Sequence, residues 1–198
     1  MRAGLVKARP VAGIAGRDAP GAPWTSRTLW IRNGVLIRRN IMDIKSIPHP
    51  ALEECFQLEA VVDTPVVAGQ SNIHGRRQLI IVKEGTLTGK LTGCVLPGGV
   101  DSQIIRPDGF TELSARYALE LEDGKTVYVE NNGIRRVDPV AAPEVAAGKI
   151  VDPKYVYFAA VPKFEVYDDS LRWLEQSLFV CYGTRLPDRV LIRFYRVL

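Results

Sequence analysis

From residue 53 onward, apolar and polar residues tend to alternate along the chain, in short runs separated by turn-forming residues. An alternation of period two is typical of strands that bury one face. Runs of this kind predict strands over Cys55–Val62, Arg76–Val82, Thr86–Leu96, Asp101–Arg106, Leu113–Asn132 (a hairpin), Tyr155–Val166, Ser177–Thr184 and Arg189–Val197. The predicted fold class is therefore all-β.

The longest alternating stretch, LSARYALELEDGKTVYVENN, contains the pair Asp123-Gly124 near its middle. Asp-Gly between two alternating runs is a strong signal for a two-residue hairpin turn, because both turn residues must tolerate a positive φ. A two-residue turn places Arg116 opposite Asn131. In that register one face carries Ser114, Arg116 and Asn131, and the other carries Tyr117, Tyr128 and Glu130.

Helix is scarce in the predicted structure. Prolines limit the segment 138–148 to a turn or two of helix, and the segment 168–175 is a second short helix. Glycines inside the strand run, at Gly89 and Gly93, are typical of bulges or strong coiling. We therefore expect a single closed antiparallel barrel rather than a sandwich, because closure removes exposed strand edges.

Charge separates the chain into two parts. Residues 1–41 contain eight Lys and Arg and one acidic residue, whereas residues 42–198 contain 18 basic and 21 acidic residues. Residues 42–198 therefore lack the basic surface that is typical of a nucleic-acid-binding protein. No apolar run approaches the roughly 18 residues of a membrane span, so neither nucleic acid nor membrane is an expected partner.

Residues 1–41 lack sustained periodicity and end next to Met42. Three interpretations remain open: a leader read from an upstream start codon, an Arg-rich transit peptide, or a disordered basic tail. The expected organisation is a disordered or mis-annotated leader over residues 1–41 and a β-barrel domain over residues 42–198.

Metal, disulfide and cofactor chemistry find no support in the sequence. The cysteines Cys55, Cys94 and Cys181 are odd in number and far apart, so they are interpreted as small buried hydrophobic residues in a reducing, cytoplasmic compartment. Only two histidines are present, and Gly98-Gly99 lacks the lysine of a phosphate-binding loop. No metal and no cofactor are predicted.

Several stretches together resemble the family known as domain of unknown function 3237. They are LPGGVDSQIIRPDG, LSARYALELEDG, NNGIR, YFAAVPKFEV, FVCYGTR and the closing YRVL. The resemblance spans residues 52–198, and it is carried by the order and spacing of the motifs. It implies a lipocalin-like barrel with an interior cavity, and it implies no settled activity.

The chain also departs from that family pattern. Ser102 stands where the family usually has Trp, and Ser114 stands where it usually has Asp. The Arg and Thr that usually precede the proline at position 162 are replaced within Phe158-Ala159-Ala160-Val161. If these positions line the cavity, the pocket is expected to be roomier and less charged than is usual in the family.

The expected ligand-binding residues are Arg116, Asn131, Gln103 and Ser114, with Asp101 beside them. A guanidinium inside a barrel needs partners, and it can hold a carboxylate, phenolate or enolate of a ligand. The alternative is a structural pair between Arg116 and Asp101 or Glu120. Gln103 shares the strand parity of Asp101, so the two are expected to face the same side.

Three residues are candidates for catalysis, namely Asp101, Tyr128 and Glu130. A carboxylate and a phenol on one strand face can act as base and acid, and the alternative is an ordinary half-buried strand pair.

The leading functional hypothesis is binding of a small aromatic or polyketide-like molecule in the barrel. A metal-free acid–base enzyme of cyclase, isomerase or hydratase type is the first alternative. An interaction module that forms homodimers is the second.

Overall fold

The structure is a computed structural model that describes residues 27–32, 35–40 and 44–198. The chain divides into two compact units, Met1–His49 and Pro50–Leu198, and each is described by itself.

In the first unit β1 (Arg27–Arg32) and β2 (Val35–Asn40) form an antiparallel pair, followed by the 3-10 turn η1 (Ile44–Ser46). Much of the predicted leader lies outside the described residues.

The second unit contains ten strands and three short helical segments. The strands are β3 (Leu52–Val62), β4 (Val66–Ser71), β5 (Gly75–Gly89), β6 (Gly93–Val95), β7 (Gly99–Ile105), β8 (Phe110–Leu121), β9 (Thr126–Val137), β10 (Val156–Val166), β11 (Phe179–Arg185) and β12 (Arg189–Val197). The helical segments are α1 (Ala142–Ala146), η2 (Pro153–Tyr155) and η3 (Asp169–Leu174). None of the helices in the described part of the chain is long and apolar enough to cross a membrane.

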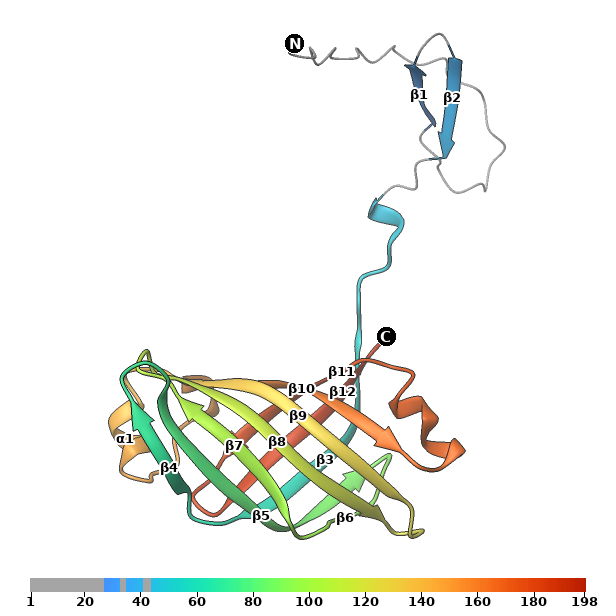
Figure 1. Cartoon of the computed structure of the whole chain (residues 1–198). Coiled ribbons are helices and arrows are strands. Elements are labelled where there is room, and N and C mark those ends of the chain that lie inside the picture. The colour runs from blue at the N-terminus through green and yellow to red at the C-terminus, as the bar shows by residue number, and fades with distance from the viewer. Residues whose placement is uncertain (1–26, 33–34, 41–43) are drawn as a thin grey trace. The chain divides into compact units, whose positions relative to one another are not determined.

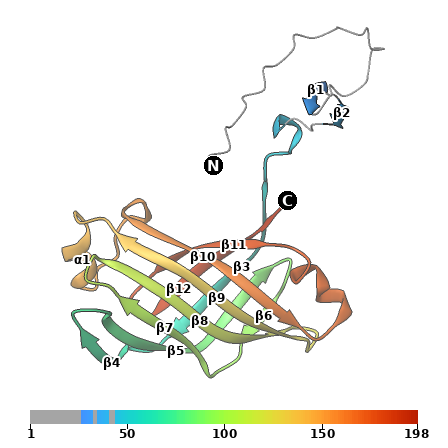
Figure 2. The ribbon, with the colours of Figure 1, turned by 45° about the horizontal axis from the view of Figure 1, so that its top comes forward.

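The strands of this unit form a closed antiparallel β-barrel, which confirms the predicted fold class (Figure 1). The sheet runs β3-β12-β11-β10-β9-β8, β7 joins β8 to β5, and β5 pairs with β3 to close the ring of eight strands. Figure 2 shows the strands crossing the barrel obliquely, as closure requires. The short strands β4 and β6 extend the wall along β5.

The strand β5 continues through a point where the sequence predicts a break between two strands, Arg76–Val82 and Thr86–Leu96. Glu84 and Gly85 lie between the predicted strands, yet β5 passes through both residues, so the predicted break is wrong. A Cβ atom at Gly85 would lie 2.5 Å from the carbonyl oxygen of Glu59 and 2.8 Å from a methyl carbon of Val95. Glycine therefore serves here for close packing against β3 and β6 rather than for a turn.

The central hairpin has a three-residue turn, and the predicted two-residue register is therefore wrong. The Leu121 N–H donates to the Lys125 carbonyl (2.8 Å), and Gly124 adopts a φ of 80°. This arrangement is the longer hairpin turn with a glycine in the left-handed region. It shifts the pairing by one residue, so Arg116 lies opposite Glu130 instead of Asn131. A shift of one residue exchanges the faces of one strand relative to the other.

One end of the barrel interior is filled by aromatic side chains. Phe56 stacks on Phe194 with ring centroids 4.6 Å apart, and Phe164 meets Phe179 edge-on at 5.1 Å. The segment η3 covers this end with the buried residues Leu171 and Leu174 and with the partly buried Trp173, which packs against the core. The barrel is therefore solid beside η3, and the free interior space lies toward α1.

Candidate functional site

A cavity occupies the half of the barrel interior nearer to α1. It holds about 60 Å³ of space and continues into a mouth of about 210 Å³ beneath the segment that includes α1. The wall is mostly apolar and includes Leu58, Val62, Ile80, Val82, Val190 and Ile192. The polar residues of the wall are Asp101, Gln103, Tyr117, Asn131, Arg135 and Arg185. Space lined by apolar surface with a few convergent polar groups is typical of small-molecule sites.

Asp101 is held in the wall by a chain of amides. Gln78 donates from Nε2 to Oε1 of Gln103 (2.9 Å), and Gln103 donates from Nε2 to Oδ2 of Asp101 (2.5 Å). The backbone N–H of Ser114 donates to the other carboxylate oxygen at 3.1 Å. Gln78 and Gln103 are both buried. The carboxylate is thus fixed on β7 by groups that leave it facing the cavity.

Burial raises the pKa of the Asp101 carboxyl above its ordinary value. The hydrogen bonds from Gln103 and from the Ser114 N–H oppose this shift, and the positive charges of Arg135 and Arg185 oppose it as well. A carboxyl whose pKa is raised by burial can hold or release a proton closer to neutral pH than an exposed one.

Arg135 and Arg185 line both the cavity and its mouth. Burial lowers the pKa of each guanidinium, and for Arg185 the charge of Arg135 lowers it further. Two of their nitrogen atoms, Nε of Arg135 and Nη1 of Arg185, are buried and have no hydrogen-bond partner in the described structure. The neck between cavity and mouth therefore carries two cations whose donors are not all used.

Tyr117, Asn131 and Cys181 form a second polar group in the interior. The amide of Asn131 donates from Nδ2 to Sγ of Cys181 at 3.4 Å. The hydroxyl of Tyr117 is buried, and the structure gives it no hydrogen-bond partner. Burial raises the pKa of Tyr117, and it raises the pKa of Cys181 to about 11. Both groups are thus protonated and neutral at physiological pH.

The structure places some of the predicted site residues in the cavity wall and others on the outer face of the barrel. Asp101, Gln103 and Asn131 lie in the cavity wall, and Asp101 and Gln103 share a face as expected. Arg116 and Ser114 lie on the outer face, because the hairpin register places Ala115 and Tyr117 inward. Arg116 donates to the hydroxyl of Ser114 (2.8 Å).

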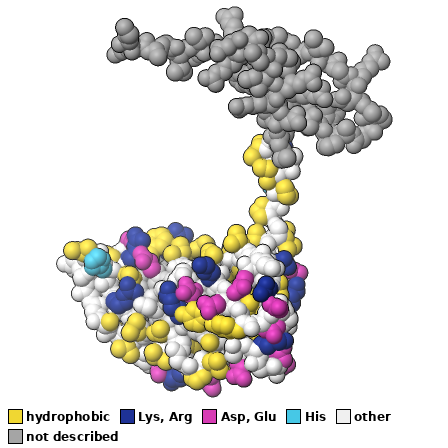
Figure 3. Space-filling view, turned by 45° about the vertical axis from the view of Figure 1, so that its right-hand side comes forward, with side chains coloured by type: hydrophobic (Ala, Val, Ile, Leu, Met, Phe, Trp, Pro, Cys, Tyr) yellow, Lys and Arg dark blue, Asp and Glu magenta, His cyan; other side chains and the backbone are white. Residues whose placement is uncertain are grey.

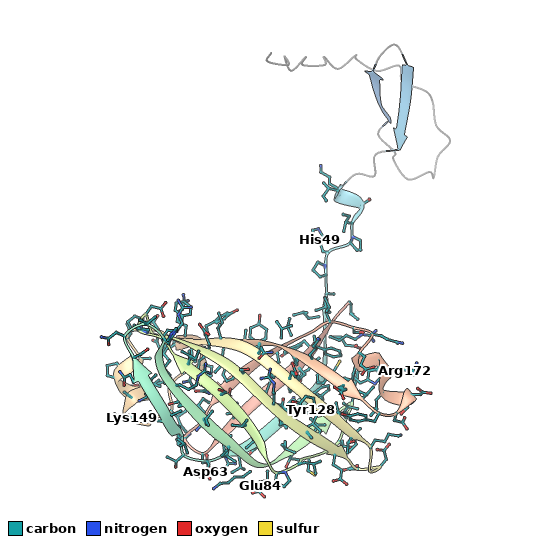
Figure 4. All side chains as sticks on the ribbon, in the orientation of Figure 1. His49, Asp63, Glu84, Tyr128, Lys149 and Arg172 are labelled. Carbon is teal, nitrogen blue, oxygen red and sulfur yellow. The ribbon has the colours of Figure 1, made fainter. Side chains whose placement is uncertain are left out.

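Tyr128 and Glu130, the two other catalytic candidates, do not line the cavity. Tyr128 is labelled on β9 in Figure 4, and it pairs with Ala118 of β8. Glu130 lies opposite Arg116 on the outer face. Both are partly exposed residues of β9.

Other predicted features are corrected by the structure. Cys94 is exposed, whereas Cys55 and Cys181 are buried. Ser102 accepts a hydrogen bond from Arg77 and, like Ser114, does not line the cavity, while Phe158 and Ala160 do. The cavity wall includes three charged residues, Asp101, Arg135 and Arg185, and its charge relative to the rest of the family stays a prediction.

Sequence reasoning missed Arg135 and Arg185. Arg135 is four residues beyond Asn131 on β9, so strand parity alone places both on one face. The signal was present in the NNGIR motif, where the predicted hairpin ended too early at residue 132. Arg185 ends β11, and the sheet order β9-β10-β11 brings it near Arg135.

The surface offers two further features. An open outer groove of about 880 Å³ includes Tyr157, Tyr182 and Leu191, which are 48%, 50% and 38% exposed. Elsewhere apolar patches are interspersed with acidic and basic side chains, as the face in Figure 3 shows.

Among the described residues no cluster of three or more His, Cys, Asp and Glu side chains is arranged to hold a metal ion.

Comparison with known proteins identifies similar chains. Residues 50–197 match the family described as protein of unknown function (DUF3237). A UPF0311 protein of Clostridium acetobutylicum is 48% identical over 157 residues, which cover 79% of this chain and 99% of the relative. A UPF0311 protein of Bradyrhizobium diazoefficiens is 43% identical over 143 residues, covering 72% of this chain and 93% of the relative.

Solved structures share the fold. A protein of unknown function from Clostridium acetobutylicum superposes with a TM-score of 0.72 at 47% identity, over 77% of this chain and 100% of that one. A β-barrel-like protein from Acinetobacter baumannii gives a TM-score of 0.68 at 30% identity, over 77% and 99%. An enzyme from Penicillium herquei superposes with a TM-score of 0.58 at 16% identity, over 77% of this chain and 98% of that one. This likeness concerns the fold alone.

Proposed function

We propose that this chain, which belongs to the DUF3237 family of proteins of unknown function, binds a small organic molecule inside its barrel. The observation that carries the proposal is the cavity, which combines an apolar wall with polar groups gathered around Asp101, Arg135 and Arg185. An aromatic or other flat apolar body suits the wall, because burial of apolar surface stabilises the complex.

Size limits the ligand. The cavity itself holds about 60 Å³, and the mouth adds about 210 Å³. A molecule of one or two rings would fill the inner space and extend past the two arginines into the mouth.

Native mass spectrometry of the full-length chain, purified from its own host, tests the proposal. Two neighbouring alanines of β10 provide matched variants: Ala160 lines the cavity, and Ala159 lies opposite the exposed residues Ile134 and Tyr182. We expect a retained organic mass in the wild type and in Ala159→Leu, and its loss in Ala160→Leu. A protein that leaves its host empty, or a mass retained equally by both variants, would contradict the proposal.

Acid–base catalysis in the same cavity is the second candidate function. The observation that favours it is the fixed, buried carboxyl of Asp101, which faces the space where a ligand would lie. In this role Asp101 would accept a proton from a carbon or oxygen acid of the substrate, and the nearby guanidinium groups would stabilise the resulting anion. If the molecule captured above is altered on incubation with the wild type but only bound by Asp101→Asn, the enzyme is supported. If it is altered equally by both, Asp101 has no catalytic role.

A further inference from the structure

We propose that Arg135 and Arg185 form an anion-binding pair at the neck of the cavity, so that the ligand is an organic anion. The ligand class would be a carboxylate, phenolate or enolate attached to a small apolar body. This inference rests on the proposed function, because it specifies which molecules the same cavity takes.

Arg135 and Arg185 lie near each other at the neck of the cavity. Arg135 comes from β9 and Arg185 from β11, and both line the inner cavity as well as its mouth. Only β10 separates the two strands in the sheet. They are close enough for the charge of Arg135 to lower the pKa of Arg185. Two like charges placed together in a largely buried site are unfavourable unless a negative charge compensates them.

The two guanidinium groups have few partners. Among the described residues the guanidinium of Arg135 has no ion pair and no hydrogen bond. Within the same described part of the chain, that of Arg185 donates only to the Pro187 carbonyl, at 3.4 Å from Nη2. Nε of Arg135 and Nη1 of Arg185 are buried and unpartnered. Buried donors without acceptors are rare in folded proteins, and a bound molecule that accepts hydrogen bonds from these two would satisfy them.

The two arginines are not fully neutralised by nearby acids. Asp101 is the carboxylate that lines the cavity beside the two arginines, and it is bound by Gln103 and by the Ser114 N–H. Asp188, the other acid that acts on Arg185, pairs with Arg189. With Asp101 ionised the neck therefore has one positive charge more than negative charge. One anionic group on the ligand would neutralise that excess.

The apolar part of the wall favours an organic anion over an inorganic one. Beyond the arginines the cavity wall is mostly apolar, with Leu58, Val62 and Ile192 among its residues. Phosphate or sulfate would leave this surface unfilled. A carboxylate or enolate carried by a ring would place its charge between planar guanidinium forks and its carbon skeleton against the wall.

Binding of 2-naphthoate and 2-naphthamide to the full-length protein tests the inference, because the two probes have similar shapes and differ in charge. Isothermal titration would compare the wild type with Arg135→Met, Arg185→Met and Arg116→Met. We expect the wild type to bind naphthoate about tenfold or more tightly than naphthamide. Each cavity variant should lose about tenfold or more of its naphthoate affinity while naphthamide binding changes little. Arg116→Met should alter neither, because that arginine lies outside the barrel.

The outcomes separate the inference from the function on which it rests. Equal affinity for the two probes in the wild type, with both lost in Ala160→Leu, would overturn the anion pair and leave cavity binding intact. Binding of neither probe, or binding that Ala160→Leu does not weaken, would contradict both the anion-binding pair and the proposed binding of a ligand in the cavity. The comparison of the two probes in the wild type requires no variant to fold. Inorganic phosphate that competes as strongly as naphthoate would overturn the organic class.

Discussion

Arg116 and Glu130 face each other across β8 and β9 on the outer surface, with Nε and Oε1 3.8 Å apart. Arg135, five residues along β9 from Glu130, instead faces the cavity. The protein thus offers one arginine in a solvated pair and one that is largely buried without a partner.

This contrast predicts opposite roles in stability. Arg116→Met should change the free energy of unfolding by less than about 1 kcal/mol, because both partners are well exposed. Arg135→Met should raise the stability of the ligand-free protein by about 1–2 kcal/mol, because an apolar side chain of similar length replaces an unpaired buried charge. Urea unfolding measures both. A marked loss of stability in Arg135→Met would show that the guanidinium has partners in the free protein.

The aromatic end of the barrel should dominate stability. Phe194 is 1% exposed and stacks on Phe56. Phe194→Ala should lower the free energy of unfolding by about 3–5 kcal/mol, because it leaves a cavity in a close-packed core. Tyr157→Ala, at a residue that is 48% exposed, is the control and should cost much less. Similar losses in the two variants would contradict the assignment of this end as the core.

Thiol reactivity should distinguish the three cysteines. Cys94 is exposed, whereas burial raises the pKa of Cys55 and raises that of Cys181 to about 11. Since the thiolate is the reactive form, Ellman's reagent should modify one thiol per folded chain at pH 8 and all three after denaturation. Fast reaction of Cys181 in the folded protein would show that the interior opens readily.

Binding of anions should depend on pH through Asp101. The folded protein raises the pKa of this carboxyl, so it becomes neutral on acidification before an ordinary aspartic acid does. Above that pKa its charge competes for Arg135 and Arg185, and below it the competition ends. Tyr117 and Cys181, the other titratable groups of the interior, keep their protons throughout this range.

We therefore expect naphthalene-2-sulfonate, which stays ionised, to bind about three- to tenfold more tightly as the pH falls through the pKa of Asp101. Asp101→Asn should bind it tightly at neutral pH with little pH dependence. Isothermal titration between pH 4 and 8 measures both. Affinity that weakens on acidification in the wild type would contradict the competition.

Much of the fold could be predicted because it depends on local pattern. Alternation identified most strands, with β12 correct at both ends, and the scarcity of helix indicated the class. The turn length of the central hairpin could not be settled locally, because Asp-Gly suits both a two-residue turn and a longer one with glycine in the left-handed region. The two-residue turn puts Arg116 on the same face as Asn131, which lines the cavity, whereas the observed turn puts it opposite Glu130 on the outer face.

The candidate site was predictable only in part for a related reason. Asp101 and Gln103 share a face by parity, and this relation is independent of how the strands pair. The approach of Arg135 to Arg185 depends on the pairing of β10 with both β9 and β11, which the alternation within one strand does not encode. The functional roles of Asn131, Gln103 and Asp101 stay predictions.

The most direct test of the cavity as a binding site is a crystal structure of the full-length protein with 2-naphthoate. We expect the naphthalene ring among Leu58, Ile80 and Ile192, with its carboxylate accepting hydrogen bonds from Arg135 and Arg185. A naphthoate found only in the outer groove beside Tyr157 and Tyr182, with the interior empty, would contradict the account.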